Sequence, residues 1–224
     1  MNDSELISFC KHLLPFEALS ESELNFVLSG SRRKAFGPKE YVFFEGDQGD
    51  AGYLVLSGRV AMVKNSARGR EMIMELLPAG ELFGLVAFID TRPYPLTARS
   101  QSESEVLILP RSVIASVTKL NPAIMKGFLA VVSSRLQTAH NVARSLAHDK
   151  VEVRIASALL AMLEKGKIAV VIGRQELADL TGTTIESASR VCKLWERDSV
   201  LDLSDMGVVR ISNLAALQSV AAED

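Results

Sequence analysis

The sequence is poor in cysteine, and its two thiols lie far apart in the chain. Cys10 and Cys192 cannot form the multiply bridged framework of a small secreted protein. They also cannot supply the four thiolates that a cubane iron–sulfur cluster usually needs, and a CxxC…CxxC zinc site is missing. We therefore expect a reducing environment, no iron–sulfur cluster and no structural metal site.

Long apolar runs are missing as well. The longest helical candidate, IASALLAML, is about half of the roughly 18 residues that a membrane-spanning helix needs. The first residues, MNDSELISFC, are acidic and polar, so we expect no secretory signal. The sequence predicts a soluble, cytoplasmic protein with no membrane partner.

The regions that carry recognisable motifs contain no paired carboxylates, no nucleophile with a base and no phosphate-binding loop. An enzyme is therefore not expected. What the sequence does have is 48% apolar and 23% charged residues in 224, the composition of a globular protein with a substantial core.

Short alternating runs broken by glycine and proline fill the chain from Tyr41 to Leu109. The stretches EYVFFEGDQGD, GYLVLSGRVAMVKN, REMIMELLPAGELFG and ESEVLILP each have the pattern of strands bounded by turns. Turns that recur at this spacing predict an antiparallel sandwich or roll of the jelly-roll type.

The period changes after Asn121-Pro122. Apolar residues then step by four and three along one continuous helix that ends near His148-Asp149, which is a heptad pattern; these are Met125, Leu129, Val132, Leu136, Ala139, Ala143 and Leu146. A two-stranded coiled coil, and hence a homodimer, explains this seam. The alternative is a helix that packs on its own domain.

The last third of the chain has the pattern of a winged helix-turn-helix. An amphipathic helix, RIASALLAMLEKG, stops at Gly166, and IAVVIG is a candidate strand. A helix in RQELADLTG, a glycine turn, a second helix in TTIESASRVCKLWER and a hairpin around residues 204–207 follow. We expect an α+β protein with a β-roll in residues 1–120, a dimerisation helix in 121–148 and a DNA-binding domain in 149–224.

The second helix of this motif has one packing face and one charged face. At 100° per residue, Lys193, Arg197 and Arg190 fall within about 40° of Glu186, and Ala188, Val191, Cys192 and Trp195 lie opposite. In a helix-turn-helix the N-terminal residues of this helix reach base edges in the major groove. Candidate DNA-binding residues are Arg174, Thr183, Thr184, Ile185, Glu186, Ser189, Arg190, Lys193 and Arg197.

Arg190 suits guanine and Glu186 suits the cytosine amino group, and the two could also pair one helical turn apart. Lys193, Arg197 and Arg174 would neutralise phosphates. The alternative is a solvated helix with a surface salt bridge. Against DNA binding, residues 150–224 hold nine Lys or Arg and eleven Asp or Glu, whereas DNA-binding domains are usually basic. We expect binding that salt weakens strongly.

Four stretches together resemble the CRP/FNR superfamily of bacterial transcription regulators, over nearly the whole chain. EGDQGDAGYLVLSGRVAMV is similar to the family's β-roll, and PAGELFGLVAFID to its phosphate-binding cassette. NPAIMKGFLAVVSSRLQTAHNVARSLA resembles the dimerisation helix, and GRQELADLTGTTIESASRVCKLWE the helix-turn-helix signature. The resemblance implies double-stranded DNA, a second copy of the chain and RNA polymerase as partners.

The cassette departs from the pattern of the cyclic AMP receptors. Leu85 follows Gly84 where they place a glutamate, and Pro95, Leu96 and Thr97 stand where an Arg-Ser pair should fall. On the long helix, Ala139 and His140 stand where those receptors place two hydroxyl residues that touch the purine. Leu136, one turn earlier, is also expected to line the effector pocket. A cyclic phosphate would enter without its counter-charge, which is costly. We therefore expect an unidentified small effector, not cyclic AMP.

The recognition helix instead resembles the FNR-like branch, since Glu186, Ser189 and Arg190 match its Glu-xx-Ser-Arg pattern and Ile185 replaces an arginine. That implies palindromes with half-sites close to TTGAT rather than TGTGA. Some FNR-like subgroups bind haem and sense nitric oxide, so a nitrogen-oxide, redox or haem sensor is one hypothesis. His140 or His12 would then be the ligand, although a surface histidine is the simpler interpretation. Unchanged haem affinity after substitution of His140 would remove that assignment.

The expected function is thus an effector-responsive homodimeric DNA-binding regulator. The effector would move the long helix and a hinge near Asp149, and so re-aim two recognition helices about 34 Å apart. The alternative is a constitutive regulator of the same family with a vestigial effector pocket.

Overall fold

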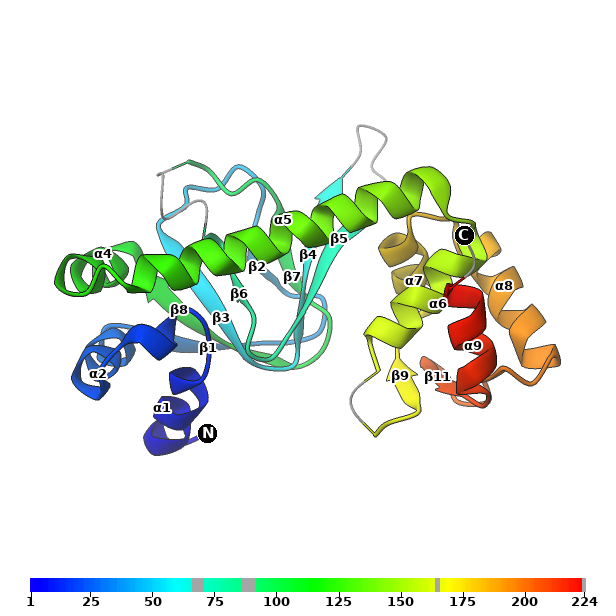
Figure 1. Cartoon of the computed structure of the whole chain (residues 1–224), viewed down its shortest axis with the longest axis horizontal. Coiled ribbons are helices and arrows are strands. Elements are labelled where there is room, and N and C mark those ends of the chain that lie inside the picture. Colours follow the sequence, from blue (N-terminus) through cyan, green and yellow to red (C-terminus); the bar gives the residue numbers. More distant parts are fainter. Residues whose placement is uncertain (66–70, 86–91, 164–165, 223–224) are drawn as a thin grey trace. The chain divides into compact units, whose positions relative to one another are not determined.

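The computed structural model describes residues 1–65, 71–85, 92–163 and 166–222 and divides the chain into two compact units (Figure 1). Unit 1 comprises Met1–Lys64 and Met74–Thr138, and unit 2 comprises Asn65–Ile73 and Ala139–Asp224. Among the described residues, no helix is both long and apolar enough to cross a membrane.

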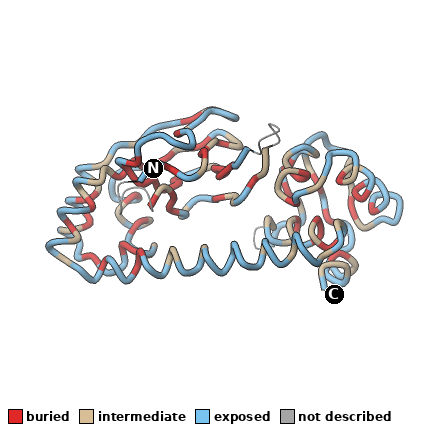
Figure 2. The backbone as a smooth tube through the Cα atoms, turned by 90° about the horizontal axis from the view of Figure 1, so that it is seen from above, coloured by how far each residue is buried: buried red, intermediate tan, exposed pale blue. Residues whose placement is uncertain are grey.

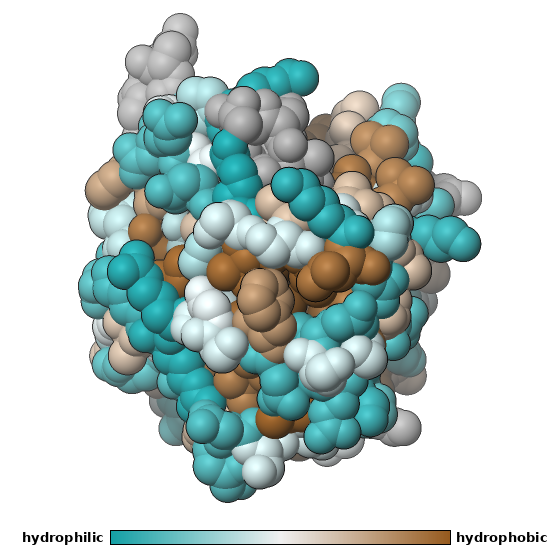
Figure 3. Space-filling model, turned by 90° about the vertical axis from the view of Figure 1, so that its left-hand side faces the viewer, coloured by the Kyte–Doolittle hydropathy of each residue, from teal (hydrophilic) through white to brown (hydrophobic). Residues whose placement is uncertain are grey.

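Unit 1 opens with short helices that the sequence reading did not anticipate. They are α1 (Asp3–Lys11), the 3-10 helix η1 (Phe16–Ala18) and α2 (Glu21–Ser29). Capping boxes, Asn2 with Glu5 and Ser20 with Glu23, start the two α-helices, because each pair satisfies two amide N–H groups that lack helical partners. Helix α4 (Arg111–Leu120) follows the last strand of the roll. At this end of unit 1, separate hydrophobic areas are bordered by hydrophilic side chains (Figure 3).

Two four-stranded sheets form the roll, with strand orders β1-β8-β3-β6 and β2-β7-β4-β5. The strands are β1 (Arg32–Phe36), β2 (Tyr41–Phe43), β3 (Ala51–Ser57), β4 (Arg59–Asn65), β5 (Glu71–Pro78), β6 (Leu82–Phe83), β7 (Thr97–Ser100) and β8 (Ser104–Pro110). Tyr53 pairs with Ile108 and Val60 with Ser100, both in antiparallel register. The predicted antiparallel roll is confirmed, and β1 and β7 are strands that the sequence reading missed.

Strand β3 is buried on both of its faces. Tyr53 and Val55 belong to the cluster between the sheets, whereas Leu54 and Leu56 belong to the cluster that also holds residues of α1, α2 and α4. Since successive side chains of a strand point to opposite faces, one continuous apolar strand serves two cores. That explains why β3 shows an apolar run without polar alternation.

The long helix predicted after Asn121-Pro122 is α5 (Ile124–His148). Its first turns are buried at Ile124, Gly127 and Phe128, and Gly127 packs so closely on Pro15 that an added Cβ would lie 2.4 Å from its Cα. Along its middle, α5 is exposed over successive turns (Figure 2). One buried end and a long exposed middle leave the apolar seam open to a partner.

Unit 2 contains the winged helix-turn-helix that the sequence predicts. Its elements are α6 (Val151–Ala161), β9 (Ala169–Val171), α7 (Arg174–Thr181), α8 (Ile185–Arg197), β10 (Leu201–Asp202), β11 (Val208–Ile211) and α9 (Leu214–Ala221). The three strands form an antiparallel sheet in the order β10-β11-β9. Helix α6 ends at Ala161 rather than at Gly166 as expected, and residues 164–165 lie outside the described ranges. Helix α9 was not predicted.

Candidate nucleic-acid interface and effector site

The turn between α7 and α8 is built by a glycine and a capping threonine. Gly182 ends α7 with φ +60° and ψ +39°, the left-handed region in which glycine alone carries no Cβ penalty. Thr184 then caps α8, because its side chain accepts a hydrogen bond from the amide of Ser187 at 3.2 Å. Thr183 is half-buried between them. These local interactions fix where the second helix begins.

Helix α8 separates its two faces as its sequence pattern predicts. Ala188, Val191, Cys192 and Trp195 are buried in the core of unit 2. The opposite face exposes the predicted base-reading and phosphate-binding residues: Ile185, Glu186, Arg190, Lys193 and Arg197 are exposed, and Ser189 is half-buried. This face of α8 therefore presents the cations of Arg190, Lys193 and Arg197, the Glu186 carboxylate and the Ser189 hydroxyl.

Arg190 makes no hydrogen bond or ion pair with any residue in the described ranges, so the expected pair with Glu186 is not formed. The Glu186 carboxylate instead lies at its own backbone N–H and at the Thr184 hydroxyl, which lower its pKa. A carboxylate at a helix N-terminus is also favoured by the helix dipole. The Arg190 guanidinium, with all its donors unused, is available for a base edge.

The predicted phosphate contacts come from two helices. Arg174, the first residue of α7, is half-buried and close enough to α8 that its charge lowers the pKa of the Cys192 thiol, against the dominant rise from burial. Arg197 pairs with Asp198 at 3.2 Å on the surface. Exposed pairs contribute about 0–1 kcal/mol, so a phosphate can replace Asp198 at little cost.

In unit 1, the predicted effector residues split between two sides of one sheet. Gly84 has φ +72°, and an added Cβ would lie 3.0 Å from the Tyr53 ring, so only glycine fits there. Leu85 does not face the space between the sheets: it is buried in the cluster that contains Leu82, Leu109 and the helical residues. Leu85, which stands where the cyclic AMP receptors have a glutamate, is therefore a core residue of unit 1.

The segment around Pro95 is held by polar contacts. Lys64 Nζ donates to the Pro95 carbonyl at 3.1 Å and pairs with Glu45 at 2.5 Å. The Thr97 hydroxyl, which is buried, accepts from the Glu45 amide at 2.9 Å. Leu96 packs against the cluster between the sheets. The only hydroxyl among the three predicted residues is therefore buried and accepts a backbone hydrogen bond.

Stacked aromatic rings occupy the space between the two sheets beside Gly84. The Phe43 ring lies 3.8 Å from the Tyr94 ring and 5.2 Å from the Tyr53 ring, centroid to centroid. Tyr53 and Phe83 stack at 5.0 Å, and the Tyr94 hydroxyl donates to the Ala51 carbonyl at 2.7 Å. Burial is the main cause that raises the Tyr53 pKa. This cluster, which the sequence reading missed, leaves the interior near the cassette apolar.

Most apolar side chains of the heptad seam of α5 are exposed in the single chain. Leu129 is 69% and Leu136 is 56% exposed, while Val132 is half-buried. Met125, Ala139, Ala143 and Leu146 are also exposed. Large aliphatic side chains at heptad spacing are rarely left in water, so a second copy of α5 is the partner that this pattern fits.

Arg135 ties α5 to the sheet in unit 1. Its Nη1 donates to Glu75 Oε2 at 2.8 Å, its Nη2 donates to the Leu82 carbonyl, and Glu81 lies 3.8 Å away. Burial raises the pKa of Glu75, and Arg135 opposes that rise. This contact joins strands β5 and β6, which lead to the cassette, to the helix that carries the seam.

The histidines proposed as haem ligands are both at the surface. His12 is exposed at the end of α1, and His140 is exposed on α5. No group of three or more His, Cys, Asp or Glu in the described ranges could hold a metal ion. Cys10 is fully buried, and burial raises its pKa to about 11, so its thiol is unreactive at neutral pH. Haem ligation by either histidine stays a prediction.

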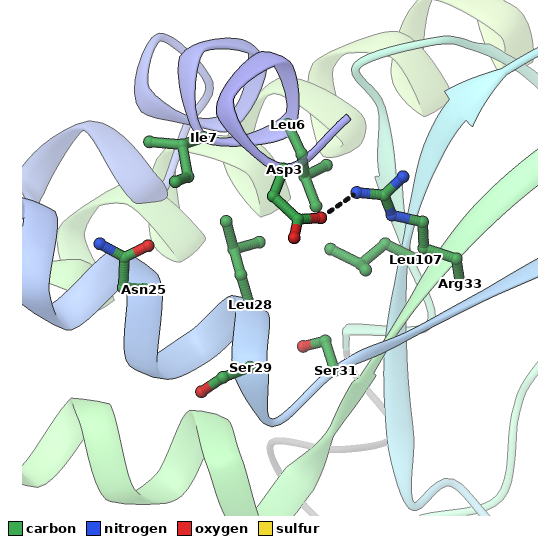
Figure 4. A pocket seen from close by; sticks show the side chains of 9 residues that line it. All are labelled: Asp3, Leu6, Ile7, Asn25, Leu28, Ser29, Ser31, Arg33 and Leu107. Atoms are coloured by element: carbon green, nitrogen blue, oxygen red, sulfur yellow. Dashed lines mark hydrogen bonds and ion pairs between the residues drawn. The ribbon is translucent and has the colours of Figure 1, made fainter. Parts of the chain in front are cut away.

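A cavity of about 290 Å³ lies between α1, α2 and the first sheet of unit 1 (Figure 4). Leu6, Leu28 and Leu107 line its interior, and Asp3 and Arg33 pair across it at 3.1 Å. None of the residues predicted for the effector pocket lines this cavity. It is therefore separate from the cassette.

Comparisons with known proteins match both units. A family model described as a cyclic nucleotide-binding domain matches residues 33–121, and one described as a Crp-like helix-turn-helix domain matches residues 153–220. The chain is 30% identical over 207 residues to the cyclic AMP receptor protein of Thermus thermophilus, covering 92% of this chain and 95% of that protein. The chain belongs to the CRP/FNR superfamily of transcription regulators.

Solved structures of the superfamily share the fold. FixK2 from Bradyrhizobium japonicum has a TM-score of 0.78 at 21% identity, covering 87% of this chain and 98% of that one. The c-di-GMP responsive regulator CLP of Xanthomonas campestris has a TM-score of 0.73 at 24% identity, covering 87% of this chain and 100% of that one. The matched Crp-like helix-turn-helix domain makes this CRP/FNR regulator a DNA-binding protein of a usually dimeric family.

Two residues of this CRP/FNR protein, Arg135 and Tyr94, make contacts that the sequence does not predict. Nothing in the pattern around Arg135 distinguishes it from a solvated arginine of a long helix. Tyr94 precedes a proline in a short loop, and only the fold shows that its ring stacks on Phe43. By contrast, the two faces of α8 follow from helical period alone.

Proposed function

We propose that this chain is an effector-responsive homodimeric regulator that reads palindromes with TTGAT-type half-sites through α8 and does not depend on cyclic AMP. The observation that carries the half-site proposal is the set formed by Glu186, Ser189 and Arg190, which lies on the solvent side of α8, where Arg190 has no partner among the described residues. Arginine pairs with guanine O6 and N7, and glutamate accepts from cytosine N4. A TGA step offers both partners but occurs in TTGAT and in TGTGA alike, so the choice of TTGAT rests on the exposed Ile185, which stands where the cyclic AMP receptors carry an arginine.

Independence from cyclic AMP is supported by the chemistry of the cassette. Leu85 is buried in the helix-side core, the Thr97 hydroxyl is buried and accepts from the Glu45 amide, and aromatic rings fill the space beside Gly84. The side chains of Leu85, Pro95, Leu96 and Thr97 carry no charge, so these four would give a cyclic phosphate no charge-assisted hydrogen bonds, which are about twice as strong as neutral ones. The Thermus thermophilus relative is named a cyclic AMP receptor protein, so under this proposal the two proteins respond to different effectors.

A calorimetric titration with cyclic AMP tests this directly. We expect no heat of binding to the purified dimer at nucleotide concentrations up to the millimolar range, and saturable binding to the Thermus thermophilus receptor measured alongside. Saturable binding to this chain at one nucleotide per subunit would contradict the proposal.

The alternative is a constitutive regulator, and the aromatic cluster is the observation that favours it. If the stacked rings of Phe43, Tyr53, Phe83 and Tyr94 leave no room for any ligand, the roll serves only to hold α5. Arg135 favours the effector-responsive form, because its contacts with Glu75 and the Leu82 carbonyl join α5 to the two strands beside the cassette, so that a change at the cassette would reach the helix. A DNA affinity that no small molecule changes would favour the constitutive form.

A further inference from the structure

The last turns of α5 pack on the helix-turn-helix within unit 2. Residues from Ala139 onward belong to the same compact unit as α7 and α8. A Cβ added to Gly182 would lie 2.6 Å from Leu146 Cδ2 and 3.9 Å from Leu146 Cγ. The end of the Leu146 side chain therefore covers the glycine of the turn between α7 and α8.

The end of α5 and the turn after α7 are also joined by one arginine side chain, which donates to a main-chain carbonyl at each of them. Arg154 of α6 donates from Nε to the Thr181 carbonyl at 2.8 Å and from Nη1 to the Asp149 carbonyl at 2.9 Å. Thr181 is the last residue of α7, and Asp149 follows the last residue of α5. A planar guanidinium with fixed donor directions thus sets the distance between the end of α5 and the start of the turn.

We infer that Leu146 and Arg154 are positioning residues that fix the direction of α8 relative to the end of α5. Leu146 is the last member of the heptad seam, but its side chain lies on the turn glycine and is less exposed, at 38%, than Leu129 or Leu136. Leu146 then acts mainly by holding α8 in the direction that the dimer needs to bind both half-sites, and contributes little to dimerisation. The Asp149 segment, expected to be a hinge, is held by Arg154. The inference rests on DNA binding and dimerisation and is independent of any effector.

The variant Leu146→Ala tests this, with Leu136→Ala as the matched control in the same seam. We expect Leu136→Ala to raise the dimer dissociation constant at least tenfold in sedimentation experiments, and Leu146→Ala to change it less than threefold. DNA binding is then measured well above that constant, on a palindrome and on the same palindrome with one extra central base pair. That insertion moves the half-sites apart by about 3.4 Å.

The wild-type dimer should prefer the shorter palindrome at least tenfold, and Leu146→Ala should reduce that preference to threefold or less. Arg154→Met should show the same loss of spacing preference without weakening the dimer. A duplex with a single half-site controls for the integrity of α8, and both variants should bind it within twofold of wild type.

Two results would overturn the inference. One is a Leu146→Ala protein that dissociates as readily as Leu136→Ala and keeps the spacing preference, because Leu146 would then be a seam residue. The other is an equal loss of affinity on the single half-site and on the palindrome, because the direction of α8 relative to α5 has no effect on a single site.

Discussion

Arg190 and Lys193 project from the same exposed face of α8, but they should contribute to DNA binding in different ways. Arg190 lies near the N-terminal end, which enters the major groove in helix-turn-helix proteins, and it is unpaired within the described ranges. Lys193 lies one turn further along, where a compact ammonium suits a phosphate. Arg190 should therefore supply specificity for the base sequence, and Lys193 should supply affinity for DNA of any sequence.

The variant Arg190→Ala should lose about 1–3 kcal/mol of binding to the cognate palindrome and should lose discrimination at the base pair that Arg190 reads. Lys193→Ala should weaken all sequences alike and reduce the salt slope by about one. Both should leave the free energy of unfolding within about 0.5 kcal/mol of wild type, because both side chains are exposed. Fluorescence anisotropy against a set of single-base variants at several salt concentrations checks this. A uniform loss for Arg190→Ala would contradict its role in base reading.

At this scale, the sequence predicts the faces of α8 but not the surroundings of the cassette residues. Helical period decides which side of α8 packs, and Trp195 and Cys192 are buried as expected. The side on which Leu85 packs depends on the turn at Gly84, whose left-handed φ no periodicity encodes. Residues in turns take their surroundings from tertiary contacts, which a single sequence does not reveal.

Among the elements, α5 is held to strands β5 and β6 by the half-buried pair of Arg135 and Glu75. Breaking such a pair leaves a charge without its partner, which is costly in proportion to burial. We expect Arg135→Met to lower the free energy of unfolding by about 1–3 kcal/mol at pH 7. The exposed pair of Arg210 and Asp205 is the control, and Arg210→Met should cost less than about 1 kcal/mol.

The cost of Arg135→Met should depend on pH. Burial raises the pKa of Glu75 in the folded protein, and loss of Arg135 raises it further. A carboxyl with a raised pKa supports the folded state below its ordinary value of about 4.5 and opposes it as the pH rises through the folded-state pKa. Urea unfolding at pH 5 and pH 7 should therefore show a smaller loss at pH 5. Equal losses at both values would contradict the role of Glu75.

Sequence pattern predicts long and amphipathic elements best. Helix α5 and the helix-turn-helix appear as expected because their periods persist over several turns. Strand β1, RRKAF, was missed because it buries only Phe36 fully, and β7, TARS, because it is short and polar. Both strands are specified by their neighbours β8 and β4, since propensity in a sheet depends on cross-strand packing.

For the whole molecule, the unusual property is a DNA-binding protein with a formal net charge of −2. Its attraction to DNA must come from a local group of cations, because the remaining surface repels phosphate. Arg190, Lys193 and Arg197 on α8, with Arg174 from α7, form that group in unit 2. In a dimer the group occurs twice, which should give a steep dependence of affinity on salt.

The proposed reading of TTGAT without cyclic AMP is tested most directly by the affinity of the dimer for two palindromes, one with TTGAT and one with TGTGA half-sites, each with and without cyclic AMP. Fluorescence anisotropy at low salt gives all four dissociation constants. We expect a preference of at least about tenfold for TTGAT, the equivalent of one discriminating base contact, and no change on adding cyclic AMP. A preference for TGTGA, or tight binding that appears only with cyclic AMP, would contradict it.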